Sequence, residues 1–308
     1  MAEFALIERF FKGLGATRSD VLLPIGDDAA LVRPPSNADV VSVSATLSAQ
    51  SANTWSDQPD SMGHRLLSCA LNRLSAAGAH GAWLTLAITL PSPDEHWLEE
   101  FCAGLSALAR RHNLSLIGGD TTSGPLVATV VVSGHAPAGE AITVHGAQPG
   151  DRSLVSGQLG SAALTTLSSA QPHRFDSAER QQAARQFAFP APRVEIAEQV
   201  RSHATAAVDL SGGLTEGLQC LLKDTGLGAT ISVTALPVAD SLRSMLIDLN
   251  LWQHLLSAAG DHEVCLCVPV ALLDSLRAAG TKVGVGYTEI GSVEVSPGLR
   301  FANRPIVE

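Results

Sequence analysis

The chain has 308 residues, of which 45% are apolar and 16% are charged, and its formal net charge is −10. This composition supplies a packed core and excludes an intrinsically disordered protein, and the length suggests two domains. A nucleic-acid-binding protein needs a basic stripe to neutralise phosphates, and this chain has no run of Lys or Arg. We therefore expect no nucleic-acid partner. We also expect this acidic protein to bind any phosphate ligand through a cation.

The sequence indicates neither targeting nor membrane insertion. Its first residues lack a basic segment followed by an apolar one, and no apolar run reaches the ~18 residues that span a bilayer. The five cysteines form no CxxC pair, and Cys265 and Cys267 alternate along an apolar run, as on one face of a strand. We expect a cytoplasmic protein with no membrane partner and with buried, reduced thiols.

Helical and strand patterns alternate along the chain. The first half is expected to contain helices over 4–11, 62–77 and 97–108, an apolar stretch over 21–25, and strands over 40–47, 83–90, 114–117 and 126–133. After the turn at 148–151 we expect strands over 153–156, 206–210, 229–233, 264–268 and 288–295, and helices after Pro192 and over 214–223, 241–249 and 271–279. This alternation predicts an α/β class, or α+β with mixed sheets, and the turn divides the chain into domains 1–147 and 148–308.

Three segments share one design, in which an apolar strand meets glycine and aspartate. They are 25–28 with Asp27 and Asp28, 117–122 with Asp120, and 207–213 with Asp209. Carboxylates at strand ends suit Mg²⁺ bridged to phosphate, and the glycines let the backbone approach a phosphate. Each motif alone is also typical of a turn closed by an Asx hydrogen bond. The absence of a Walker A motif, and of Gly-x-Gly-x-x-Gly at the first strand turn, argues against a P-loop or Rossmann site.

The order of these segments resembles the thiamine-monophosphate kinase family, within the aminoimidazole ribonucleotide synthetase and selenophosphate synthetase superfamily. The matching segments are 3–7, 25–31, 83–91, 116–125, 148–151, 209–214 and 261–264. The resemblance implies an N-terminal sheet that pairs with a second subunit's in a homodimer, a C-terminal α/β domain, and transfer of the ATP γ-phosphoryl group onto thiamine monophosphate. It implies that Asp28, Asp120 and Asp209 bind Mg²⁺. It also implies that Gly119, Asp120 and Ser211 contact ATP.

Several positions depart from the family's pattern. Ala45, Arg73 and Gly212 stand where the family has aspartates of its metal and nucleotide site, and Gly260 stands where a substrate-contacting glutamate is expected. The segment 48–55, which in the family helps to hold the substrate, is rewritten. We therefore expect fewer Mg²⁺ ions than the family binds. The phosphate acceptor could be thiamine monophosphate or a related small phosphate.

Arg73 reverses the charge at its position, and three interpretations follow. Its guanidinium could neutralise Asp28 and Asp120 and abolish metal binding, it could replace a metal as a fixed cation that contacts a phosphate, or it could point into solvent. His262, which replaces a family tyrosine, could be a pH-sensitive ligand or a structural histidine.

Three functions remain open at this point. The chain could be a working kinase with weakened metal binding, or it could transfer phosphate to another acceptor. It could also be a pseudoenzyme, a catalytically inactive relative that binds a ligand or pairs with an active subunit.

Overall fold

The computed structural model describes residues 3–48, 58–92, 94–171, 173, 175–240, 242–243 and 252–302. The chain forms two compact units, Met1–Leu74 with Ala79–Ala141, and Ser75–Gly78 with Ile142–Glu308. The division after Ala141 lies six residues before the expected domain boundary at 147/148, which stays a prediction. Most of the rewritten segment 48–55, and most of the helix expected over 241–249, lie outside the described residues.

The first unit begins with a helix, as predicted. Helix α1 (Glu3–Leu6) continues as the π-helix η1 (Ile7–Phe11), which buries Phe10 and Phe11. Arg9 of η1 forms ion pairs with Glu95 and with Glu99, the latter at 2.7 Å. The short strands β1 (Val21–Leu23) and β2 (Leu31–Val32) then pair antiparallel. The N-terminal helix is therefore tied by charge to the helix that carries Glu95 and Glu99.

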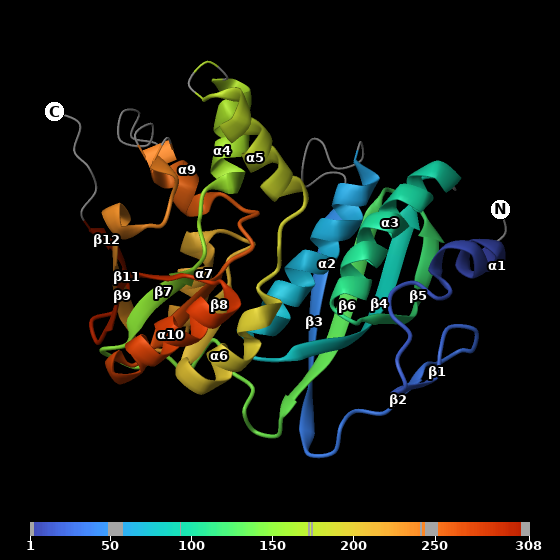
Figure 1. Ribbon diagram of the computed structural model, residues 1–308, viewed down its shortest axis with the longest axis horizontal. Coiled ribbons are helices and arrows are strands. Elements are labelled where there is room, and N and C mark those ends of the chain that lie inside the picture. Colours follow the sequence, from blue (N-terminus) through green and yellow to red (C-terminus); the bar gives the residue numbers. More distant parts are fainter. Residues whose placement is uncertain are drawn as a thin grey trace. The chain divides into compact units, whose positions relative to one another are not determined.

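A four-stranded sheet forms the centre of the first unit. Its strands β3 (Ala38–Ser48), β4 (His80–Leu90), β5 (Ser115–Ser123) and β6 (Val127–Pro137) lie in the order β3-β6-β4-β5, and only β4 and β5 run parallel. Helices α2 (Pro59–Ala76) and α3 (Glu95–Arg111) cover one face (Figure 1). The other face carries cross-strand hydroxyl pairs, Ser42–Ser133 at 2.8 Å and Thr46–Thr129 at 2.9 Å, which are exposed.

Strand β5 corrects one expectation about the Gly-Gly-Asp segment. The strand was expected to stop at residue 117, but it continues to Ser123, and Asp120 pairs in register with Ala87 of β4. A Cβ at Gly119 would lie 1.8 Å from the carbonyl oxygen of Leu86, so only glycine lets β5 approach β4 this closely. Asp120 is therefore held within a strand and not in a turn after one.

The second unit is built on a six-stranded sheet. Its strands are β7 (Arg152–Ser156), β8 (Ala206–Asp209), β9 (Gly228–Ser232), β10 (Val264–Val268), β11 (Tyr287–Glu294) and β12 (Gly298–Ala302). Their order is β12-β9-β11-β7-β10-β8, and all neighbours are antiparallel except β9 and β12. The sequence predicted every one of these strands except β12.

Helices and short helical turns surround this sheet. They are α4 (Ser161–Ala170), α5 (Ser177–Ala188), η3 (Val194–Ile196), α6 (Ala197–His203), α7 (Leu214–Leu222), η4 (Val233–Ala235), α9 (Trp252–Ser257), η5 (Val270–Leu272) and α10 (Leu273–Val283). Helices α4 and α5 were not predicted, because alanine and polar residues dominate both and leave little apolar periodicity. None of the helices in the described part of the chain is long and apolar enough to cross a membrane.

Strand β10 explains how the second unit is packed. Cys265 and Cys267 belong to one hydrophobic cluster, while Val264, Leu266 and Val268 belong to another that includes residues of α6 and α10. Both faces of β10 are thus buried, as is typical of a strand between two helical layers, and burial raises the pKa of Cys267 to about 12. The expectation of buried thiols is correct for these two cysteines and for Cys102, whereas Cys69 is half-buried and Cys220 is exposed.

Candidate functional site

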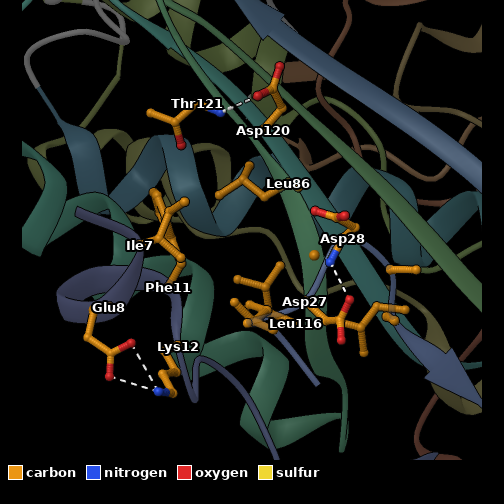
Figure 2. Close-up of a pocket in the computed structure, with 17 residues that line it drawn as sticks. Ile7, Glu8, Phe11, Lys12, Asp27, Asp28, Leu86, Leu116, Asp120 and Thr121 are labelled. Carbon is orange, nitrogen blue, oxygen red and sulfur yellow. Dashed lines mark hydrogen bonds and ion pairs between the residues drawn. The ribbon is translucent and has the colours of Figure 1, made fainter. Parts of the chain in front are cut away.

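A pocket of about 710 Å³ lies in the first unit, where three distant parts of the chain meet (Figure 2). The N-terminal helix contributes one wall, the segment 25–30 after β1 a second, and strands β4 and β5 a third, through Leu86 and residues 116–121. Segments 25–30 and 116–121 carry two of the Gly-Asp motifs singled out in the sequence. The fold thus brings Asp28, Gly119 and Asp120 to one pocket.

The pocket is apolar on one side and acidic on another. Ile7, Phe11, Leu86 and Leu116 form the apolar part, and the side chain of Thr121 lies toward Ile7 (Figure 2). Asp27, Asp28 and Asp120 line the pocket as well, and all three are exposed. At the edge formed by η1, Lys12 pairs with Glu8 at 2.8 Å. A ligand with an apolar ring and a charged group would find surfaces of both kinds here.

Local hydrogen bonds hold the acidic side chains in position. The amide of Asp28 donates to Oδ1 of Asp27 at 2.7 Å, and the amide of Thr121 donates to Oδ1 of Asp120 at 2.9 Å. Both bonds join a side chain to the amide of the next residue, so neither is the Asx bond of the expected turn, which reaches two residues on. Because the carboxylates are exposed, such a bond does not prevent a cation from replacing the water around their remaining oxygen lone pairs.

The other predicted residues, Asp209 and Ser211, belong to the second unit. Asp209 is the last residue of β8, as the strand-end argument expected, and Oγ of Ser211 donates to its Oδ2. The following turn is held by main-chain bonds, including that from the Gly213 amide to the Leu210 carbonyl at 2.9 Å. A further bond, from the Gly260 amide to the Ser211 carbonyl at 2.8 Å, ties the turn to the segment before β10.

Arg73 lies in the last turn of α2, is exposed, and donates from Nη1 to the main-chain carbonyl of Ser44 at 2.6 Å. Ser44 is in β3, at the edge of the sheet opposite to β5, with β6 and β4 in between. Three strand spacings, roughly 14 Å, therefore separate this anchor from the strand that carries Asp120. Within one chain, this arrangement favours a cation fixed at β3 over a guanidinium that neutralises Asp120.

The pocket beside β5 has side chains that suit Mg²⁺, whereas the β3 edge of the sheet does not. In the described part of the chain, no group of three or more His, Cys, Asp or Glu side chains is arranged to hold a metal ion. Mg²⁺, however, commonly uses one or two carboxylates together with waters and phosphate oxygens, which Asp28 and Asp120 fit. The β3 edge does not fit it, because Ala45 is a buried methyl group and the guanidinium of Arg73 already contacts the adjacent carbonyl.

A buried polar cluster in the second unit was not recognised from the sequence. Glu263 accepts hydrogen bonds from Nε of Arg193 at 2.6 Å and from Oγ of Ser156 at 2.6 Å. Asp261 accepts from the amides of Gly160 at 2.7 Å and Ala162 at 3.1 Å, at the start of α4. Burial raises the pKa of Asp261 to about 6 and also raises that of Glu263, against the opposing effect of Arg193.

This cluster lines a small cavity of about 180 Å³, which also includes Gly260 and His262. His262 is 7% exposed and so belongs to the interior of the unit. The carboxylates of Asp261 and Glu263 hold the connection between β7 and α4. Only the folded structure shows these contacts.

Comparison with known proteins identifies the class. Residues 26–136 match the family model of the AIR synthase related protein N-terminal domain, and residues 148–302 match that of the AIR synthase related protein C-terminal domain. The folded chain also superimposes on the crystal structure of thiamine-monophosphate kinase from Stenotrophomonas maltophilia K279a, with a TM-score of 0.87 and 33% identity, over 99% of this chain and 98% of that one. The two units are therefore the two domains of an AIR synthase related fold.

The relatives narrow the assignment within that class. The chain is 37% identical to the thiamine-monophosphate kinase of Salmonella typhimurium over 305 residues, which cover 97% of this chain and 93% of the relative. It also shares its fold, at 18% identity and a TM-score of 0.75, with AaThiL complexed with AMPPCP and TMP, over 99% of this chain and 95% of that one. The chain belongs to the thiamine-monophosphate kinase family.

Proposed function

We propose that this chain catalyses ATP-dependent phosphorylation of thiamine monophosphate, giving thiamine diphosphate. The observation that carries the proposal is the pocket in which Asp28, Gly119 and Asp120 meet beside an apolar wall, in a chain 37% identical to a thiamine-monophosphate kinase. A relative of the same fold is complexed with AMPPCP and TMP. ATP and thiamine monophosphate are therefore the ligands we expect to bind.

Phosphoryl transfer depends mainly on positioning and on neutralising charge. We assign the apolar wall of the pocket to the nucleotide base and its acidic side to the phosphates. Asp28, Asp120 and Asp209 are the candidate ligands of a reduced set of Mg²⁺ ions, which when bound would neutralise the phosphate oxygens. Gly119 and Ser211 are the candidate nucleotide contacts, because a glycine or a small hydroxyl side chain permits close approach of a phosphate.

Arg73 is proposed as a fixed cation at the β3 edge of the sheet, where it replaces one metal ion that the family resemblance implies. Its contact with the Ser44 carbonyl holds the guanidinium beside Ala45, where the family resemblance implies an aspartate. A guanidinium binds phosphate oxygens well and is charged at every physiological pH. The guanidinium of Arg73 would then neutralise part of the phosphate charge without a divalent ion.

We also propose a cytoplasmic homodimer that forms through the sheet of the first unit. In the described residues, helices cover only one face of this sheet (Figure 1). The opposite face carries exposed hydroxyl pairs, and Val40 and Val131 are 53% and 37% exposed. Strand β3 is an edge strand of 11 residues, long enough to be covered by a partner. A strictly monomeric mass in solution would contradict this part of the proposal.

A non-catalytic relative is the second candidate, favoured by Ala45, Arg73 and Gly212, which stand in three separate segments where the family resemblance implies aspartates. It predicts nucleotide or ligand binding without turnover. Phosphotransfer to another acceptor is a third candidate, favoured by the rewritten segment 48–55.

The deciding experiment incubates the purified protein with ATP, Mg²⁺ and thiamine monophosphate and quantifies thiamine diphosphate by chromatography. We expect product that depends on Mg²⁺ and is lost in Asp120→Asn, whereas Asp94→Asn, at the N-cap of α3, retains activity. ATP binding by calorimetry without any product would favour the non-catalytic candidate. Product formed only with a different phosphate acceptor would favour the third.

A further inference from the structure

The hairpin of β1 and β2 carries one wall of the pocket and is attached to the rest of the first unit at its base. Its tip, residues 25–30, lines the pocket. Strands β1 and β2 pair with each other, and among the described residues no hydrogen bond joins residues 22–31 to any residue outside the hairpin. Three of its apolar side chains are exposed: Leu22, Leu23 and Leu31. The place of the tip therefore depends on how the base is held.

Asp20 holds the base of this hairpin through both its side chain and its main chain. Its carboxylate accepts from Nε and Nη2 of Arg18 at 2.9 and 2.6 Å, and from Nε1 of Trp83 at 3.2 Å. Its carbonyl accepts from the amide of Arg33 at 2.8 Å, which closes the hairpin. Within residues 20–33, all of which the structure describes, no other side chain is hydrogen-bonded to the sheet.

These bonds connect the hairpin to the two strands that form the opposite wall of the pocket. Trp83 is a buried residue of β4. Nη1 of Arg18 donates to the carbonyl of Asn113 at 2.7 Å, two residues before β5 begins. The guanidinium of Arg18 also lowers the pKa of Asp20, so this carboxylate is charged at neutral pH. The base of the hairpin is thus fixed to β4 and to the start of β5, the strand that carries Asp120.

We propose that Asp20 is a positioning residue, which sets the place of Asp28 relative to Asp120 through the hairpin. Asp20 does not line the pocket, whereas the other two residues do, so any effect of Asp20 on a ligand must pass through the hairpin. A displacement of about 1 Å in a site that positions phosphates can cost roughly a hundredfold in rate. This inference rests on the proposed function, in which Asp28 and Asp120 act together on ATP and Mg²⁺.

An alternative account is that Asp20 only stabilises the fold. A double-mutant cycle with Asp28 separates the two accounts, because the effects of independent residues add, whereas those of residues that act through each other do not. Asp94 provides a matched control in the same unit. Its carboxylate is also bonded locally, since it accepts from the amide of Trp97 at 3.1 Å at the N-cap of α3, and it has no bond to the hairpin.

The test is calorimetric titration of the full chain with ATP in the presence of Mg²⁺. Asp20→Ala is expected to weaken ATP binding by about tenfold or more in the wild-type background, but by less than about twofold in the Asp28→Asn background. Asp94→Ala should change the affinity by less than about twofold in both. Amide hydrogen exchange over residues 21–32 should become faster in Asp20→Ala, while exchange in β6 stays unchanged.

A milder variant keeps the test decisive if Asp20→Ala does not fold. Asp20→Asn retains an oxygen that can accept from Trp83 and loses the ion pair with Arg18, so it should show the same dependence on Asp28 with a smaller loss of affinity. Equal losses in the two backgrounds, or unchanged ATP affinity in both Asp20 variants, would overturn the inference.

Thiamine diphosphate formation tests the proposed function separately. Product formation together with additive losses leaves the kinase assignment and removes the positioning role of Asp20. ATP binding with the expected non-additivity but without product retains the positioning role and removes the kinase assignment. Absence of ATP binding by the wild-type protein would contradict both.

Discussion

Asp261 accepts the main-chain amide of Gly160 at 2.7 Å through Oδ2 and that of Ala162 at 3.1 Å through Oδ1. One buried carboxylate, 6% exposed, thereby binds the start of α4 to the segment before β10. Glu263, two residues further on, holds the same connection through Ser156. The β7–α4 connection is therefore fixed by two acids from one short segment, and its stability should depend on pH and on charge.

The pH dependence follows from the pKa of Asp261, which burial raises to about 6 from its ordinary value of 3.8. The folded state binds the proton more tightly than the unfolded state, so this carboxyl group contributes stability below pH 3.8 that is lost as the pH rises through about 6. The full difference corresponds to roughly 3 kcal/mol. Chemical denaturation at pH 5 and pH 7.5 should show a smaller free energy of unfolding at the higher pH. In Asp261→Asn this part of the difference should disappear, and an unchanged pH profile would contradict the assignment.

Removing the cation from the Arg193–Glu263 pair should be costly. Arg193→Met leaves Glu263, whose side chain is 7% exposed, buried without a counter-charge, and breaking such a pair typically costs roughly 3–5 kcal/mol. The half-exposed pair of Arg152 and Glu289, 3.6 Å apart, provides the control, because Arg152→Met should cost less than about 1 kcal/mol. Urea denaturation measures both. Similar losses for the two variants would show that burial does not determine the cost.

The two neighbouring glycines of β5 should respond very differently to alanine. At Gly119 a Cβ would lie 1.8 Å from the Leu86 carbonyl oxygen, so β5 would have to move away from β4, and we expect a loss of several kcal/mol together with weaker ATP binding. At Gly118 the nearest atom is Cγ2 of Thr85 at 3.9 Å, so Gly118→Ala should be tolerated. Thermal unfolding and ATP calorimetry on both variants test this. Equal melting temperatures would refute the close-approach argument.

Arg73 should determine how strongly nucleotide binding depends on metal. If its guanidinium replaces one ion, ATP binding by the wild-type protein persists in part when EDTA removes divalent cations. Arg73→Asp should abolish that residual binding and increase the dependence on Mg²⁺, by about tenfold or more in Kd. Arg110→Asp is the control, since Arg110 is also an exposed arginine near a helix C-terminus, and its Nε contacts the Gly15 carbonyl at 3.3 Å. Identical metal dependence in all three proteins would place Arg73 outside the nucleotide site.

The sequence alone determined much of the architecture, because periodicity is a local property. The apolar run at 264–268 predicted β10 with its two buried cysteines, and the helical spacing after residue 62 predicted α2. The order of seven short segments spread along the chain was sufficient to indicate the family, to which the comparisons then assigned the chain. Helices α4 and α5 escaped prediction, because their alanines and polar residues leave little amphipathic contrast, and their buried residues belong to a cluster that includes distant helices and strands.

Only the tertiary structure decided which of the candidate site residues lie together. It showed that Asp120 lies within β5, that β3 and β5 are opposite edges of one sheet, and that the Asp261 side chain binds the start of α4. None of these relationships has a signature in the sequence, because each depends on strand order or on the path of a side chain across a turn. Local propensity fixes which residues form a strand, whereas long-range pairing fixes what lies beside it.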